Sequence, residues 1–152
     1  MINHIFLDLD GVLSDFHSEY GQHTKEEWQI EFPKFIERRA FVDLKMLPDA
    51  IELIDFLDTL GIPITILSSA GGFADYYDDI VDQKIEWLYN HAIKYPAIIV
   101  PQKQVKAQFA GPTRLLIDDQ GINCNNFWQA GGQSIQHVSA RDTIDKIKEA
   151  LA

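Results

Sequence analysis

Two aspartates, Asp8 and Asp10, follow a short apolar stretch near the start of the chain. Alternate residues of a strand face the same side, so their carboxyl groups would lie roughly 6 to 7 Å apart. That separation suits two carboxyl groups that address opposite sides of one reacting centre. Gly11 then lets the backbone turn sharply. A D-x-D pair by itself is better explained as a solvated acidic turn, so its meaning depends on polar residues elsewhere.

Three further polar groups lie at the ends of apolar stretches or just before one: Ser68 and Ser69, then Lys103 and Lys106, then Asp118 and Asp119. In this order they offer a nucleophile, an acid/base, a hydroxyl donor, a fixed cation and metal ligands. Each signal is weak alone. Their joint occurrence favours a catalytic site over coincidence.

Alternating strands and helices are predicted to position these groups. The apolar runs predict strands at 5–7, 62–67, 97–100, 114–119 and 135–138, and helical spacing predicts helices at 48–60, 75–93, 103–110, 121–130 and around 144–151. This alternation indicates a three-layer α/β fold with a mainly parallel sheet. A right-handed crossover would bring Ser68 to the same sheet edge as Asp8.

Residues 16–46 are predicted to form a small cap inserted after the first strand of a single domain, 1–152. Thr24 and Glu27 form a capping-box pattern that starts a helix, and Pro33 is expected to break or kink it. The segment is rich in aromatic residues: Trp28, Phe32, Phe35 and Phe41. These rings are available to stack on a substrate, although for most of them the small core of the cap itself is the favoured role.

The chain carries 23 acidic and 13 basic residues, for a formal net charge of −10, and has no run of Lys or Arg. This composition argues against binding to duplex nucleic acid. A small phosphate ester could still bind if a divalent metal supplied positive charge locally. A single cysteine, Cys124, excludes an internal disulfide and is expected to serve in packing. Without an apolar run of ~20 residues, the chain is expected to be soluble and cytoplasmic, without a membrane partner.

These motifs resemble those of the haloacid dehalogenase (HAD) superfamily of aspartate-nucleophile phosphatases. The resemblance rests on Asp8-Leu9-Asp10-Gly11-Val12, on Ser68 after its apolar run, on Lys106 in preference to Lys103, and on Asp118-Asp119. The segments Asp10–Phe16, Lys84–Trp87 and Leu115–Asp119 are more narrowly similar to the 5'(3')-deoxyribonucleotidase branch. The resemblance implies a Rossmann-like core with strand order 5-4-1-2-3 and a small helical cap after strand 1.

The resemblance also implies a role for each residue. Asp8 would be the nucleophile that forms an aspartyl-phosphate, and Asp10 would protonate the leaving oxygen and then activate water. The expected phosphate and substrate contacts are Ser68, Ser69, Ala70 and the backbone amides there, Lys106, Phe16 and His17. A Mg²⁺ ion would be held by Asp8, Asp118 and the Asp10 carbonyl, assisted by Asp119. The implied partner is a small phosphorylated substrate such as a (deoxy)nucleoside monophosphate.

Departures from the nucleotidase pattern leave the substrate open. Gln120 stands where those enzymes tend to have Arg, and Ser68-Ser69-Ala70 stands where Thr-Ser-Pro is common. The alternatives are a phosphatase for sugar phosphates or phosphorylated oligonucleotide ends, and a noncatalytic phosphate-binding module with the same fold. Lys84 is predicted to be a surface charge with Trp87 packed below it. Asn123 is predicted either to orient its loop or to touch a ligand.

Overall fold

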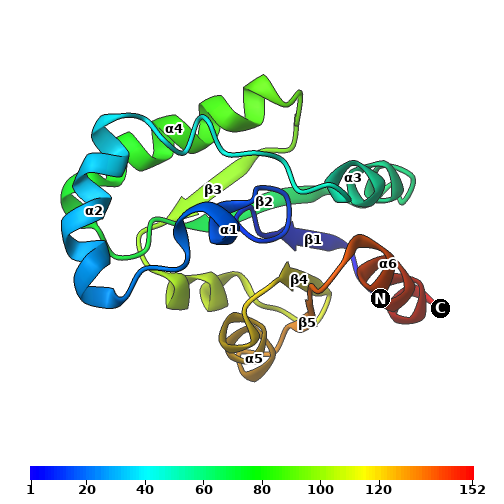
Figure 1. The fold of residues 1–152 in the computed structure, drawn as a ribbon. Coiled ribbons are helices and arrows are strands. Elements are labelled where there is room, and N and C mark those ends of the chain that lie inside the picture. Colours follow the sequence, from blue (N-terminus) through cyan, green and yellow to red (C-terminus); the bar gives the residue numbers. More distant parts are fainter.

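Five parallel strands form one sheet in the order β3-β2-β1-β4-β5 (Figure 1). The computed structural model describes all residues 1–152. The strands are β1 (His4–Leu7), β2 (Ile64–Ser69), β3 (Ala97–Val100), β4 (Arg114–Asp118) and β5 (Gln133–Gln136). Read from the other edge, this is the predicted order 5-4-1-2-3. The predicted α/β fold class and strand order are therefore confirmed.

The strands are connected by helices, as expected for parallel neighbours. The α-helices are α1 (Phe16–Tyr20), α2 (Lys25–Glu37), α3 (Ala50–Asp58), α4 (Tyr77–Asn90), α5 (Gly121–Gln129) and α6 (Ala140–Leu151). Two 3-10 helices are η1 (Ala74–Tyr76) and η2 (Lys103–Phe109). Both chain termini lie beside α6, at the opposite end of the sheet from α2 (Figure 1).

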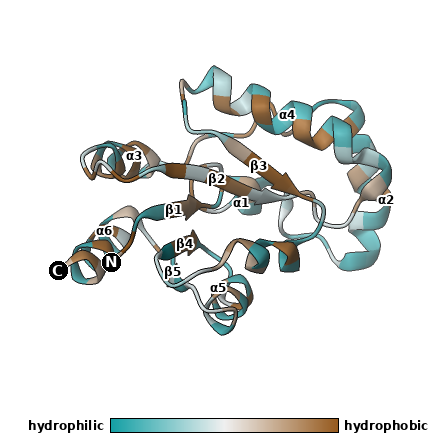
Figure 2. Cartoon of the chain, turned by 180° about the vertical axis from the view of Figure 1, so that it is seen from behind, coloured by the Kyte–Doolittle hydropathy of each residue, from teal (hydrophilic) through white to brown (hydrophobic).

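The two faces of the sheet bury two separate apolar clusters. Ile5 and Leu7 of β1 belong to a cluster of 29 buried residues that includes side chains of α3, α4 and α6. Phe6 points the other way, into a cluster of five that includes Phe127 of α5 and is flanked by Val105 of η2. This alternation along β1 explains why its sequence is a continuous apolar run. Figure 2 shows apolar colour along β2 and β3, between helices whose colours are mixed.

Two strands are shifted by two residues from the prediction, which placed them at 62–67 and 135–138. Ser68 and Ser69 lie inside β2, because the ladder to β3 continues through the pair Ser69 and Val100. β5 spans Gln133–Gln136, where it pairs with β4. β5 is an edge strand rich in polar residues, so its pairing is set by the backbone and leaves little apolar signal in the sequence.

The segment between β1 and α3 holds α1 and α2, which lie beyond the carboxyl ends of the strands (Figure 1). The predicted capping box is present: the Thr24 hydroxyl accepts from the Glu27 amide and the Glu27 carboxylate accepts from the Thr24 amide. Of the predicted break or kink at Pro33, the break is wrong, because α2 continues to Glu37. Phe32 and Phe35 are buried on either side of the proline, and this packing outweighs one lost backbone hydrogen bond.

No helix combines the length and the apolar composition that a membrane span requires.

Candidate active site

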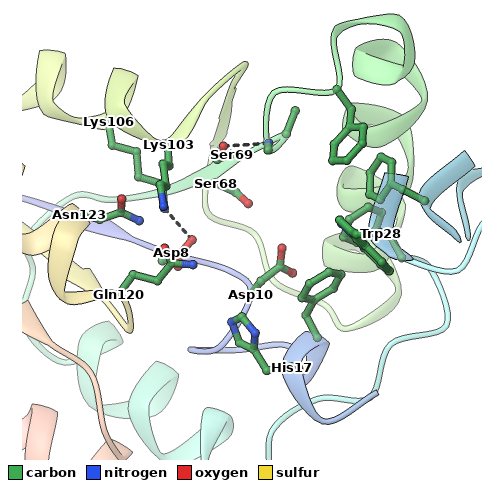
Figure 3. A pocket seen from close by; sticks show the side chains of 16 residues that line it. Asp8, Asp10, His17, Trp28, Ser68, Ser69, Lys103, Lys106, Gln120 and Asn123 are labelled. Carbon is green, nitrogen blue, oxygen red and sulfur yellow. Dashed lines mark hydrogen bonds and ion pairs between the residues drawn. The ribbon is translucent and has the colours of Figure 1, made fainter. Parts of the chain in front are cut away.

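The predicted site residues of three strands meet at the carboxyl edge of the sheet, where open α/β sheets place their ligands. Asp8 follows β1, Ser68 lies near the end of β2, and Asp118 ends β4. A cavity of about 230 Å³ opens above this edge and is lined by Asp8, Asp10, Ser68, Ser69 and Lys106 among others. In Figure 3 these polar residues face Trp28 across the cavity.

Asp8 is almost completely buried, with 5% of its surface exposed. Its Oδ1 accepts from the Lys106 ammonium at 2.9 Å and from the Leu9 amide at 2.8 Å. These two donors fix the carboxylate and leave Oδ2 without a donor. Burial raises the pKa of Asp8 well above its usual range, against the lowering effect of Lys106, and the neighbouring charge of Asp118 raises it further.

Lys106 is the lysine that reaches the site. Its ammonium lies 2.9 Å from Asp8 Oδ1, the contact that is dashed in Figure 3. The ammonium also lies 2.8 Å from Asp118 Oδ2, and the residue is buried. Burial alone would lower the Lys106 pKa, but the two carboxylates outweigh it and raise the pKa, so the side chain stays charged. Lys103 is exposed and lines the same cavity without an ion pair. The structure thus joins Lys106, and not Lys103, to the aspartates.

Asp8, Asp118 and Asp119 form a cluster in which each offers one carboxylate oxygen, all within 4.8 Å of one another. Asp119 Oδ1 is buried and has no hydrogen-bond partner. Gly11 adopts a φ of +83° and leaves room for the Asp119 side chain, because a Cβ on Gly11 would lie 2.2 Å from Asp119 Oδ2. Three buried or partly buried carboxylates facing one ammonium leave an excess of negative charge, and hard oxygen ligands of this kind suit a divalent cation.

The other aspartate of the first motif, Asp10, is turned away from this cluster. Its Oδ2 accepts from Lys84 Nζ at 2.9 Å and its Oδ1 accepts from the Ser14 hydroxyl at 2.8 Å. The side chain is 21% exposed and lines the cavity. The carboxylates of Asp8 and Asp10 therefore border one cavity with separate partners, and only Asp8 belongs to the acidic cluster.

Lys84 was predicted to be a surface charge, and this prediction is wrong because the residue is buried. It is only 1% exposed, and its ammonium donates to Asp10, to the Ser68 hydroxyl at 2.7 Å and to the Ser69 carbonyl at 2.9 Å. The ammonium also lies 5.0 Å from the centre of the Phe41 ring. A signal for this burial was present, since Ile80 and Trp87 bracket Lys84 at helical spacing on the buried face of α4.

The backbone amides of the turn after β2 donate hydrogen bonds to acceptors within the protein. Ala70 donates to the Val100 carbonyl, Gly72 donates to the Pro101 carbonyl, and the Gly71 amide donates to Ser69 Oγ (Figure 3). The expectation that these amides face a phosphoryl group does not fit this arrangement. Polar donors on this side of the cavity are instead the buried Ser68 hydroxyl and the Lys84 ammonium that contacts it.

The predicted aromatic residues pack on one another and also border the cavity. Its lining includes Phe16, Trp28, Phe32, Phe41 and Phe73. Phe16 stacks on Phe41 with 5.7 Å between ring centres, while Phe35 is buried beneath them. The small aromatic core of this segment thus presents one face to the cavity.

His17 also lines the cavity, and its Nε2 lies 3.3 Å from Asp119 Oδ2. The hydrogen bond to Asp119 raises the His17 pKa. Asn123 donates to Asp118 Oδ2 at 3.1 Å, so in this structure it orients an acidic side chain of the site. Cys124 is buried, as a packing role requires, and burial raises its pKa to about 11.

No protein-family model and no curated protein matches the sequence. Solved structures do match in fold. A HAD-superfamily hydrolase from Ehrlichia chaffeensis superposes with a TM-score of 0.62 at 12% identity, over 100% of both chains. L-2-haloacid dehalogenase from Xanthobacter autotrophicus gives 0.57 at 15% identity, over 88% of this chain and 76% of that one.

D,D-heptose 1,7-bisphosphate phosphatase from Burkholderia thailandensis is a third match, with a TM-score of 0.53 at 12% identity over 95% of this chain and 97% of that one. At such identities the likeness concerns the fold, and function has to be argued from the site. The chain has the fold of the haloacid dehalogenase superfamily hydrolases.

Proposed function

We propose that this protein is a Mg²⁺-dependent phosphomonoesterase that works through an aspartyl-phosphate on Asp8. The observation that carries the proposal is the buried Asp8 carboxylate, which Lys106 and the Leu9 amide hold by one oxygen at the floor of the cavity. The other oxygen has no donor and is the one that would attack phosphorus. Covalent catalysis of this kind divides one difficult displacement into two easier ones.

The reaction needs an acid for the leaving oxygen and later a base for water, and Asp10 is the proposed group for both. In the first step Asp8 Oδ2 bonds to phosphorus, the ester P–O bond breaks, and the leaving oxygen takes a proton from Asp10. In the second step Asp10 takes a proton from water, which attacks phosphorus and releases Asp8 and inorganic phosphate. Asp10 borders the same cavity as Asp8, which gives it access to the substrate.

Positive charge for the phosphoryl oxygens is proposed to come from two lysines. Lys106 is fixed between Asp8 and Asp118, and Lys84 is fixed between Asp10 and Ser68. An incoming phosphoryl group beside Ser68 would share the Lys84 ammonium. Phosphoryl transfer depends mainly on such positioning and charge stabilisation.

The acidic cluster is the proposed Mg²⁺ site, with Asp8 and Asp118 as ligands, Asp119 in support and the Asp10 carbonyl as a further ligand. The unpartnered Asp119 Oδ1 and the excess of carboxylates over ammonium groups fit a cation there. Bound Mg²⁺ would neutralise charge on the phosphoryl oxygens and on Asp8. The same cluster favours phosphoryl transfer over carbon–halogen cleavage, the reaction suggested by the name of the matched dehalogenase.

Residues 16–46 are proposed to act as a cap that selects the leaving group. The aromatic side chains that line the cavity can stack on a planar ring, so deoxynucleoside monophosphates, which carry a planar base, are one substrate class to test. The matched heptose bisphosphate phosphatase makes sugar phosphates the second class. The net charge of −10 disfavours phosphorylated oligonucleotide ends. A noncatalytic phosphate-binding module would not need a carboxylate oxygen without a donor, such as Asp8 Oδ2, in its cavity.

The substitution Asp8→Asn tests the nucleophile. We expect it to reduce phosphate release from a panel of nucleoside and sugar monophosphates by at least ~10³-fold, because the amide cannot form the acyl-phosphate. Release is measured with Mg²⁺ and with EDTA. Asp43→Asn, at an exposed position outside the cavity, is the matched control and should retain activity. Activity that survives in Asp8→Asn would refute the assignment. Binding of Mg²⁺ and phosphate esters without turnover would favour the binding module.

Mg²⁺ binding should weaken at low pH. Because the pKa of Asp8 is raised, a proton occupies this carboxylate more readily than an ordinary one, and the cation has to displace it. We expect the dissociation constant to rise when the pH is lowered from about 8 to about 5, because Asp8 takes up a proton in this direction. Titration calorimetry in two buffers of different ionisation heat should show proton release. An affinity that is constant over this range would contradict a cation site at Asp8.

Removal of the Lys84 charge should impair both phosphate binding and turnover. We expect Lys84→Met to weaken inorganic phosphate binding and to lower kcat by ~10²-fold, because Ser68 and Asp10 lose their shared donor. Lys94→Met, at an exposed position, is the control. Calorimetry gives the phosphate affinity, steady-state kinetics give kcat, and thermal unfolding verifies the fold. Unchanged phosphate affinity and kcat in a folded Lys84→Met protein would remove Lys84 from the mechanism.

A further inference from the structure

Phe73 separates the candidate active site from a second cavity. This outer cavity, of about 320 Å³, is lined by Gln29 and Pro33 of α2 and by residues 72–76. Phe73 is the one residue that lines both the outer cavity and the active-site cavity of about 230 Å³. Its side chain is half-buried. The boundary between the two spaces therefore includes this ring.

The ring of Phe73 is stacked on the ring of Phe32, with 3.9 Å between centres and 22° between planes. Phe32 comes from α2 and is buried, whereas Phe73 comes from the turn between β2 and η1. Phe32 belongs to the proposed cap and Phe73 to the core, and both rings line the active-site cavity. Together they form a wall of side chains, which we call the Phe32–Phe73 wall.

The backbone before Phe73 is held in place at the edge of β3. Two successive glycines adopt positive φ, +73° at Gly71 and +83° at Gly72, a conformation that side-chain-bearing residues rarely take. The Gly72 amide donates to the Pro101 carbonyl at 2.9 Å. The Tyr76 amide then donates back to the Phe73 carbonyl. The backbone position of Phe73 thus follows from a hydrogen-bonded turn.

We propose that Phe73 determines specificity by limiting the size of the leaving group. This inference rests on the proposed phosphatase function. The active-site cavity alone is smaller than the ~300 to 1,000 Å³ typical of ligand pockets, whereas the two cavities joined would fall within that range. With the Phe32–Phe73 wall intact, the site accepts a leaving group of about one ring, which favours the sugar phosphates over the deoxynucleoside monophosphates among the substrate classes proposed above. A second ring requires the outer cavity, where Gln29 and Asp75 offer polar groups.

The test compares phenylphosphonate with biphenyl-4-ylphosphonate, which cannot be hydrolysed at an ester oxygen and differ by one ring. Titration calorimetry with Mg²⁺ measures the affinity of each for the full-length protein. We expect the wild type to prefer phenylphosphonate. The Phe73→Ala variant should shift the affinity ratio toward the biphenyl compound by at least ~10-fold, because the second ring gains access to the outer cavity. Phe73→Leu should give a smaller shift in the same direction.

Tyr76→Ala is the matched control, because Tyr76 lines the outer cavity without bordering the active site. It should leave the affinity ratio unchanged. An unchanged ratio in folded Phe73→Ala, an equal shift in Tyr76→Ala, or the absence of binding by both compounds in all variants would overturn the proposal. Hydrolysis of phenyl phosphate by the wild type is assayed separately. If the phosphonates bind with the expected ratios and no ester is hydrolysed, the proposed function fails, and the result shows only that Phe73 limits the size of the group that a bound phosphonate carries.

Discussion

The arrangement of the candidate active site depends on two buried salt bridges, from the Lys106 ammonium to the carboxylates of Asp8 and Asp118. β1 and β4 are parallel neighbours, and the Asp8 amide donates to the Ile117 carbonyl, so the two strands deliver Asp8 and Asp118 side by side. Two buried carboxylates without a partner would carry a large desolvation cost. Lys106 offsets part of this cost, and the remaining negative charge of the acidic cluster suits a bound metal ion.

The two lysines approach the strand ends from opposite faces of the sheet. Phe6 and Leu116 point toward the face covered by η2 and α5, and by alternation Asp8 and Asp118 lie on that side, within reach of Lys106. Ile64 and Ile66 of β2 point to the other face, and Ser68 continues their side. This is the face covered by α4, which supplies Lys84. A phosphoryl group in the cavity would therefore lie between two cations, although the whole chain carries a net charge of −10.

The parts of this arrangement that follow from local sequence could be predicted. Apolar runs ending in Asp8, Ser68 and Asp118 predicted the strands, and the family resemblance implied their order. Lys106 could be preferred over Lys103 only through the family resemblance, because both lie in one short helix. The structure separates them, since η2 packs on the sheet with Lys106 inward and Lys103 exposed.

Other features depend on tertiary packing, which short stretches of sequence do not reveal. Lys84 reads as a surface charge until β2 and Phe41 are placed against α4 and supply partners for its ammonium. Pro33 reads as a helix break until the aromatic residues around it are buried. The second cavity and the Phe32–Phe73 wall arise where α2 meets a turn about forty residues later in the chain. Local sequence patterns carry no information about this tertiary contact between α2 and the turn that holds Phe73.

The central claim is that Asp8 becomes phosphorylated during turnover. The most direct measurement is peptide mass spectrometry of protein quenched in acid while it hydrolyses a phosphate monoester with Mg²⁺. A phosphoryl adduct on Asp8 is expected in the wild type. It should disappear when the substrate is exhausted and should be absent from Asp8→Asn. Turnover without an adduct on Asp8, or with the adduct on another residue, would contradict the account.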